Sequence, residues 1–304
     1  MRTSWHDPEF IAPDDVRFES PGTWREALEL KAQHPDALPI CGGTDVMVDI
    51  NFARSRPGTM LDLTRVSELA EWRQTDGSIE LGAGVTYTTI ERELSVALPS
   101  LAKAARTVGS PQIRNRGTVG GNLGTASPAG DAHPALLATG ATVEVESVRG
   151  RRQVNIDDYF VGPKRSVLQP DELIRAVRVP VADGPQEFAK IGTRNAMVIA
   201  TVAFALAINV GVRRAGTGIG SAGPVPLRAA AAEDFLNSAL AEMWSAPAPL
   251  DATTVSHFGN LVASAASPID DVRGTAIYRR HALSVLARRS LGWAWDAFIA
   301  EVAA

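Results

Sequence analysis

The glycine-rich run from Gln112 to Asp131 constrains this chain more than any other segment. It contains five glycines and one proline, and its only apolar residues of any size are Ile113, Val119 and Leu123. A segment of this composition cannot form part of an ordinary hydrophobic core. Glycine lets a backbone approach a ligand closely, and successive N–H groups in a glycine-rich turn form a concave site for an anion. We therefore expect this run to be a loop that binds phosphate.

Composition narrows the classes of protein to which the chain can belong. A length of 304 residues allows two domains, each with its own core. With 45% hydrophobic residues, 21% charged residues and a net charge of −4, the chain is typical of a globular protein, and nucleic acid is not an expected partner. The N-terminal residues 1–15 have no apolar segment of the kind found in signal peptides, and no run of 18 uncharged apolar residues occurs, so we expect a cytoplasmic protein without membrane insertion.

The sequence lacks the motifs that are typical of a metal centre or of a hydrolytic catalytic site. The single Cys41 excludes an intramolecular disulfide and any all-cysteine zinc or iron–sulfur site made by this chain alone. The five histidines lack ligand spacing, so we expect no metal site. A nucleophile elbow is also missing. We therefore assign no catalytic residue, and hydrolysis is disfavoured.

The first half of the chain alternates helical and extended patterns. Thr23 and Glu26 form a capping box for a helix that continues to Gln33. Strands are predicted at 37–41, 59–63, 79–85 and 141–148, and helices at 87–94, 98–108 and 134–139. This half is expected to mix helices and strands throughout.

The second half has its strands first and its helices last. Strands are predicted at 173–180 and 187–191, followed by long extended segments at 197–212 and 216–226 and by helices at 228–244, 252–267 and 275–303. The stretch 182–185 is typical of a linker, which places the domain boundary between residues 1–182 and 183–304. We expect an α+β fold in which the C-terminal domain has an antiparallel sheet with helices on one face.

A second glycine-rich segment, Gly42-Gly43-Thr44-Asp45, follows a short apolar strand. Alone it indicates little, because a glycine pair after a strand is usually only a turn. The dinucleotide fingerprint Gly-x-Gly-x-x-Gly and the phosphate loop with Gly-Lys-Ser/Thr are both missing. Two anion-binding loops about 75 residues apart nevertheless favour a ligand with two phosphates. A dinucleotide is the simplest candidate.

Four pieces of the sequence carry a family resemblance. They are residues 40–45, 112–131, 223–228 and 278–281, and 118–128 is the most specific of these stretches. In this order they resemble the FAD-binding subunit of the molybdenum hydroxylases, a family that includes the medium subunit of carbon monoxide dehydrogenase and the flavin portion of xanthine dehydrogenase. The resemblance implies a two-subdomain FAD-binding domain of the vanillyl-alcohol-oxidase (PCMH) type at 1–182. A C-terminal domain of the molybdenum hydroxylase flavoprotein type follows at 183–304.

The resemblance also implies a set of residues that hold non-covalent FAD. The pyrophosphate would be wrapped by the backbone of Ile40, Cys41, Gly42, Gly43, Thr44, Asp45 and Val46 and by that of Thr118, Val119, Gly120, Gly121 and Asn122. Thr118, Asn122 and Thr125 would form hydrogen bonds around the phosphates and the flavin, and Asp131 would contact ribityl or ribose hydroxyls. Lys190 matches a family lysine near the isoalloxazine ring, where a cation favours reduction. Val108 stands where some relatives place an aromatic ring against adenine.

Several roles stay open in the sequence. Asp45 contacts a ribose hydroxyl or caps the following turn, since Asp favours caps regardless of function. Cys41 could attach flavin covalently, but a lone cysteine beside a strand is more often a small buried hydrophobe. Arg114 and Arg116 support the glycine-rich run, face FAD or form a basic rim for a partner.

Three functional hypotheses follow, of which the first is favoured. In a three-part molybdenum hydroxylase, a large subunit carries molybdopterin and a small subunit carries [2Fe-2S] clusters. This chain would then take electrons from the clusters and pass them to an external acceptor, in a dimer of heterotrimers. The alternatives are a self-sufficient FAD-dependent oxidoreductase with its own substrate pocket and a structural subunit without cofactor. The retained glycine pairs at 42–43 and 120–121 argue against the last.

Overall fold

The computed structural model describes residues 16–303, so the expectation about residues 1–15 lies outside the described residues. Within that range the strands form sheets of three, five and three strands and one two-stranded ribbon. Helices and strands alternate through the first half, and long helices close the chain. This arrangement confirms the α+β class. In the same range, no helix has both the length and the apolar character needed to cross a membrane.

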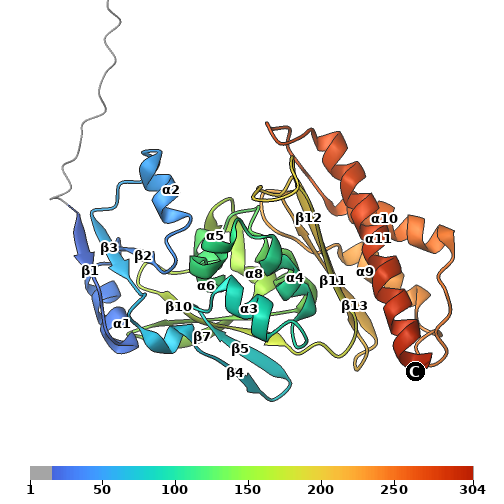
Figure 1. The fold of residues 1–304 in the computed structure, drawn as a ribbon, viewed down its shortest axis with the longest axis horizontal. Helices are drawn as coiled ribbons and strands as arrows, with labels where there is room; N and C mark the ends of the chain where they lie inside the picture. The colour runs from blue at the N-terminus through green and yellow to red at the C-terminus, as the bar shows by residue number, and fades with distance from the viewer. Residues whose placement is uncertain (1–15, 304) are drawn as a thin grey trace, which may run out of the picture.

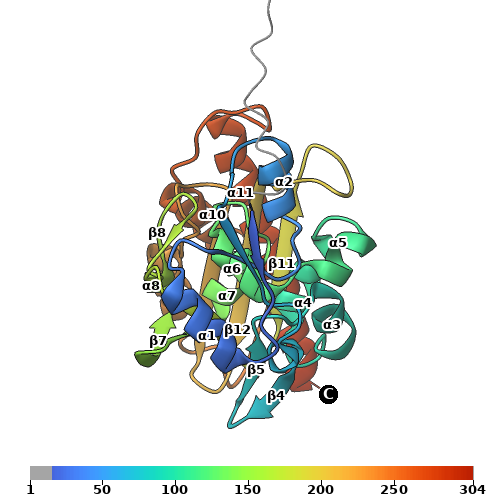
Figure 2. The same ribbon diagram turned by 90° about the vertical axis from the view of Figure 1, so that its left-hand side faces the viewer.

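The first sheet is parallel and small. Strands β1 (Arg17–Glu19), β3 (Thr59–Asp62) and β2 (Leu38–Ile40) lie side by side in that order, with α1 (Trp24–Gln33) between β1 and β2 in the chain. Helix α1 begins as predicted, because the Thr23 hydroxyl accepts a hydrogen bond from the N–H of Glu26. Helix α2 (Val46–Asn51) follows β2 and extends away from the sheet (Figure 2).

The second sheet is antiparallel and has the order β4-β5-β10-β6-β7. Its strands are β4 (Trp72–Thr75), β5 (Ser78–Gly82), β6 (Thr142–Ser147), β7 (Gly150–Asn155) and β10 (Leu173–Pro180), and the turn η2 (Ser67–Ala70) precedes β4. Between β5 and β6 the chain forms α3 (Tyr87–Glu93), α4 (Pro99–Thr107), α5 (Pro111–Arg116), α6 (Val119–Thr125) and α7 (Ala132–Thr139). After β7 come α8 (Ile156–Tyr159) and the ribbon of β8 (Phe160–Gly162) and β9 (Arg165–Ser166).

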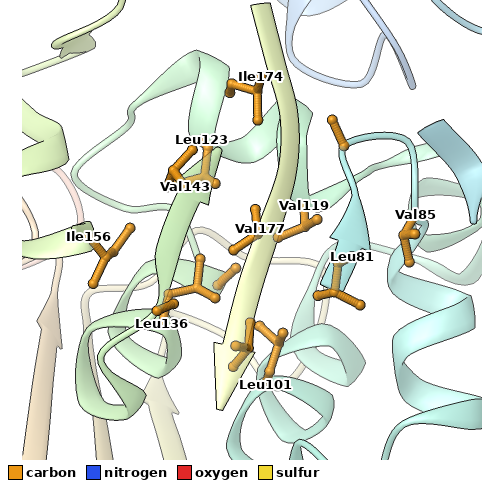
Figure 3. Close-up of a cluster of buried hydrophobic side chains, with 14 of the residues drawn as sticks. Leu81, Val85, Leu101, Val119, Leu123, Leu136, Val143, Ile156, Ile174 and Val177 are labelled. Carbon is orange, nitrogen blue, oxygen red and sulfur yellow. The ribbon is translucent and has the colours of Figure 1, made fainter. Parts of the chain in front are cut away.

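The glycine-rich run is not an open loop, because it forms the short helices α5 and α6. Ser110 caps α5 by accepting from the N–H of Ile113, and Thr118 caps α6 by accepting from the N–H of Gly121 at 2.9 Å. Val119 and Leu123 are fully buried and pack beneath the second sheet (Figure 3). The two caps and this one apolar stripe outweigh the low helix propensity of glycine.

The third sheet consists of β11 (Gln186–Ile191), β12 (Val202–Asn209) and β13 (Arg214–Gly220). Helices α9 (Ala230–Ala239), α10 (Ala252–Ala265) and α11 (Ala276–Ala303) lie on one side of it, and α4 and α7 pack against β11, β12 and β13 (Figure 1). Two glycines allow this packing. A Cβ at Gly216 would lie 2.2 Å from the Ala138 carbonyl oxygen, and a Cβ at Gly218 would lie 1.9 Å from that of Pro134. Helix α7 is thereby brought directly against β13.

One predicted strand is shorter than expected. The extended pattern at 197–212 corresponds to β12 only from Val202, and the residues before it are irregular, with Met197 at a φ of 49°. Thr201 ends this irregular segment and is held by Arg279, whose Nη1 donates to the Thr201 carbonyl oxygen at 2.6 Å. Tertiary contacts therefore fix a segment whose residue types alone favour a strand.

Candidate functional site

A cavity of about 890 Å³ lies where the two glycine-rich segments meet. Its lining includes the turn 42–46 that leads into α2, much of α6, the start of α7 and residues 197–199 that precede β12. Residues separated by more than 150 positions in the sequence therefore surround one space. The volume lies within the range of about 300–1,000 Å³ typical of small-molecule and cofactor sites.

Most of the residues that the resemblance implied line this cavity. They are Cys41, Gly42, Gly43, Thr44, Asp45, Val46, Val108, Thr118, Gly120, Gly121, Asn122, Thr125 and Asp131. The exceptions are Ile40, Val119 and Lys190. Val119 is fully buried in the core, and Lys190 lies behind Asp131.

The turn at residues 42–46 presents free backbone donors. None of the N–H groups of Gly42, Gly43, Thr44, Asp45 and Val46 has an acceptor among residues 16–303. Gly43 has a φ of 75°, a conformation that glycine adopts without strain. A Cβ at Gly42 would lie 1.9 Å from the Arg116 carbonyl oxygen, so glycine here lets the two segments touch. Consecutive free N–H groups in such a turn are suited to an anion.

The backbone of the second segment is different, because only the N–H group of Thr118 has no acceptor among residues 16–303. Those of Val119 and Gly120 donate to the carbonyl oxygens of Val85 and Ala83, and those of Gly121 and Asn122 donate to Thr118. Four of its five N–H groups are therefore not available to a pyrophosphate, and the contact of Thr118–Asn122 with the pyrophosphate stays a prediction. The segment instead supplies side chains to the cavity and a firm attachment to the end of β5.

Asp45 joins the two segments. It occupies the N-cap position of α2, but its side chain makes no capping hydrogen bond. Its Oδ2 instead accepts from the Thr125 hydroxyl at 3.1 Å. The capping alternative is thus wrong for this side chain, and its contact with a ribose hydroxyl stays a prediction.

Asp131 and Lys190 form a buried ion pair at the cavity wall. The distance from Lys190 Nζ to Asp131 Oδ2 is 2.8 Å, and the side chains are only 6% and 13% exposed for Lys190 and Asp131, respectively. Lys190 Nζ also donates to the Thr107 carbonyl oxygen at 3.2 Å. Burial raises the pKa of Asp131 to about 6, although Lys190 opposes the shift; nearby Asp45 adds to it. Lys190 therefore contacts the carboxylate that faces the cavity and does not itself line it.

Three residues that line the cavity carry side-chain polar atoms that are buried and have no hydrogen-bond partner among the described residues. They are Tyr87 Oη, Asn122 Oδ1 and Asp131 Oδ1. Buried polar groups in folded proteins are nearly always paired. Unpaired groups that share one cavity indicate a ligand with complementary donors and acceptors.

Cys41 is a partly buried residue that packs against the core. Burial raises the pKa of its thiol to about 11, and the nearby Thr118 hydroxyl opposes this shift. A thiol with so high a pKa is a poor nucleophile at neutral pH. This property favours the prediction of a small apolar lining residue over that of a covalent flavin attachment.

Arg114 supports the glycine-rich run. Its guanidinium forms an ion pair with Glu91 at 3.3 Å and donates to the Val108 carbonyl oxygen at 3.3 Å. Val108 thereby has its backbone fixed where it lines the cavity. Arg116 is exposed and contributes its backbone to the contact with Gly42.

Sequence reasoning missed several lining residues. Tyr87, Lys164 and the segment 197–199 were assigned no role, yet all line the cavity. Lys164 Nζ forms an ion pair with Asp49 of α2 at 2.9 Å. Tyr87 could have been found as a polar aromatic residue that follows a capping threonine and β5, whereas nothing local marks Lys164 or Met197.

These residues fit FAD in charge, size and polarity. The free N–H groups at 42–46 suit a pyrophosphate, and the unpaired Asn122 and Asp131 oxygens suit hydroxyl or N–H donors. Val108, Ile113 and Met197 add apolar surface. The cavity therefore offers each kind of contact that a flavin dinucleotide requires.

Comparison with known proteins agrees with this geometry. Residues 14–182 match the family model for the FAD binding domain in molybdopterin dehydrogenase, and residues 187–294 match that for the CO dehydrogenase flavoprotein C-terminal domain. The nicotine 6-hydroxylase medium subunit of Paenarthrobacter nicotinovorans is 34% identical over 91% of this chain and 96% of its own length. The nicotinate dehydrogenase FAD-subunit of Eubacterium barkeri is 38% identical over 64% of this chain and 69% of its own.

A solved structure shows the same fold. Carbon monoxide dehydrogenase from Hydrogenophaga pseudoflava superimposes with a TM-score of 0.84 and 26% identity, over 93% of this chain and 98% of the matched chain. The resemblance seen in the sequence and the expected fold type are thus confirmed. The chain belongs to the FAD-binding medium subunits of the molybdenum hydroxylases, which are oxidoreductase flavoproteins of the xanthine dehydrogenase family.

Proposed function

We propose that this chain is the electron-transfer subunit of a larger molybdenum hydroxylase, in which it receives electrons from [2Fe-2S] clusters on a partner and passes them to an external acceptor. The observation that carries the proposal is the single cavity that joins five free N–H groups at 42–46 to the buried polar groups of Asn122 and Asp131. An anion-binding turn and a polar wall in one space suit a dinucleotide.

Within this cavity the chain's own residues bind and orient the cofactor. The turn 42–46 would hold the pyrophosphate, Asn122 and Asp131 would accept hydrogen bonds, and Val108 would contact adenine. When bound, the flavin supplies the electron-transfer chemistry that amino-acid side chains lack. Lys190 favours the charged form of Asp131, and a carboxylate at the cavity wall would accept hydrogen bonds from ligand groups that donate them.

The partners follow from what this chain lacks and from the names of its relatives. With one cysteine, it cannot ligate an iron–sulfur cluster of the all-cysteine type by itself. The relatives named above are a medium subunit and an FAD-subunit, which indicates division of labour among chains. We infer a large molybdopterin subunit and a small [2Fe-2S] subunit, assembled as a dimer of heterotrimers. A cytoplasmic location stays a prediction from the sequence.

Purification from the native host tests this proposal. A yellow complex that contains this chain with one larger and one smaller subunit, and whose flavin is released by acid, is the expected result. A flavin-containing chain that purifies without partners would support a self-sufficient oxidoreductase instead. A complex that contains this chain without flavin would support a structural subunit and overturn the proposal.

A further inference from the structure

Tyr87 lines the cavity and has a buried hydroxyl without a partner among residues 16–303. The residue is 2% exposed, lines the cavity and carries one of the three unpaired polar atoms of its wall. The other two are the amide oxygen of Asn122 and a carboxylate oxygen of Asp131. A buried hydroxyl without a partner lowers stability, so a residue of this kind points to a ligand that pairs with it.

The backbone of Tyr87 is held rigidly. It is the first residue of α3, where the Thr86 hydroxyl caps the helix by accepting from the N–H of Thr89. Its own N–H donates to the Gly117 carbonyl oxygen at 3.1 Å. A Cβ at Gly117 would lie 3.4 Å from Tyr87 Cδ2, so the ring fits closely beneath the connection between α5 and α6. The ring of Tyr87 therefore has a defined position beside the cavity.

The three unpaired groups have complementary chemistry. Tyr87 Oη carries a proton, because burial raises the pKa of its phenol well above the usual value and the carboxylates of Asp131 and Asp45 add to that shift. It is thus a donor, whereas Asp131 Oδ1 and Asn122 Oδ1 accept. A ligand hydroxyl can accept from the first and donate to either of the others. The wall therefore matches a ligand that bears hydroxyl groups.

We propose that Tyr87 is a cofactor-binding residue, whose hydroxyl donates a hydrogen bond to a ligand hydroxyl that lies between it and the oxygens of Asp131 and Asn122. The proposal rests on the proposed binding of FAD and adds a contact to it. FAD carries such hydroxyls on its ribityl chain and on its adenosine ribose, and both sources share this chemistry.

Tyr87→Phe tests the proposal, because it removes only the hydroxyl and keeps the ring that packs against Gly117. We expect FAD to bind the purified apoprotein about 3- to 10-fold more weakly than in the wild type, as for the loss of one neutral hydrogen bond. Separate titrations with riboflavin 5′-phosphate and with ADP identify the source. Weaker binding of the first alone assigns the ribityl chain, and weaker binding of the second alone assigns the ribose.

Tyr159→Phe is the matched control. Tyr159 is fully buried, but its hydroxyl donates to the Leu123 carbonyl oxygen at 3.3 Å, so its loss should lower the free energy of unfolding and leave FAD affinity unchanged. Unchanged affinity for FAD in Tyr87→Phe, with wild-type protein that does bind FAD, would overturn the role of Tyr87. Wild-type apoprotein that fails to bind FAD would instead overturn the proposed function.

Discussion

Lys190 Nζ lies 2.8 Å from Asp131 Oδ2, and this contact ties β11 of the third sheet to the residue that precedes α7. Two nearly buried charges must be paired to be tolerated. The pair therefore does two things at once. It fixes the third sheet against the cavity wall, and it leaves Asp131 Oδ1 free to face a ligand.

Lys190→Met should destabilise the apoprotein by about 3 kcal/mol at pH 8, because it leaves the Asp131 carboxylate buried without its cation. Urea unfolding at pH 8 and pH 5 measures the effect. The pKa of Asp131 is already about 6 with Lys190 present, and it should rise further in the variant, so the carboxyl group is neutral at pH 5 and the loss should shrink there. Equal losses at both pH values would contradict this account of the pair.

FAD affinity should fall as pH decreases below about 6. Burial raises the pKa of Asp131 to about 6; Lys190 opposes this rise and Asp45 adds to it. The carboxyl group of the apoprotein therefore takes up a proton in this pH range. A ligand that donates hydrogen bonds to the carboxylate binds its charged form better. Protonation of Asp131 therefore lowers the affinity for the ligand by up to about tenfold per pH unit. Asp131→Asn should bind more weakly and show a flatter profile. A profile that falls just as steeply in the variant would remove Asp131 as the cause.

The free energy of unfolding should also depend on His133. Burial lowers the pKa of its ring to about 4, below the unfolded value of 6.5, so the unfolded chain binds the proton more readily. Stability from this group is complete above pH 6.5 and is lost as pH falls towards 4, by ~3 kcal/mol in all. Between pH 7 and pH 4.5, the free energy of unfolding measured with urea should change less steeply with pH in His133→Gln than in the wild type. Identical slopes would refute the prediction.

Cys41 should react slowly with iodoacetamide in the folded protein. Burial raises the pKa of its thiol to about 11 from 9.0, which lowers the thiolate fraction about 100-fold at pH 8. Since Cys41 is the single cysteine, mass spectrometry of the intact chain reports its alkylation alone. The urea-unfolded chain serves as reference. Comparable rates in the two states would show that the thiol is not buried in solution.

Much of the fold could be predicted from local patterns. The cap at Thr23 set the start of α1, and the extended pattern at 141–148 corresponds to β6. The parallel pairing of β1, β2 and β3 was not predicted, because it depends on contacts between distant segments. The placement of Met197 in a strand was wrong for the same reason. The irregular segment before β12 depends on the contact between Thr201 and Arg279, which are about 80 residues apart in the sequence.

The sequence predicted which residues line the candidate site better than it predicted how their backbone groups are used. Glycine content marked both segments, but it could not distinguish glycines that free N–H groups for a ligand from glycines that permit packing. Gly120 is of the second kind, because a Cβ there would lie 2.5 Å from the Ala83 carbonyl oxygen. A valine at Gly120 would therefore detach α6 from the end of β5, and loss of flavin in that variant would say nothing about a phosphate.

Gly124→Leu is a better probe of the cavity. Gly124 lies in α6 and lines the cavity, and a Cβ there would meet only Ile174 Cδ1, at 4.0 Å. A leucine should fill space that FAD needs and should stabilise the helix by up to about 1 kcal/mol relative to glycine. Gly292→Leu in α11 is the matched control, because a Cβ at that position meets nothing within 4 Å.

Flavin content per chain of the purified complex tests the central claim most directly. We predict one acid-releasable FAD per chain in the wild type and in Gly292→Leu. In Gly124→Leu we predict at least a tenfold lower content, with unchanged subunit composition and with an apoprotein that is no less stable than the wild-type apoprotein. Full flavin content in Gly124→Leu, or none in the wild type, would contradict the assignment of this cavity to FAD.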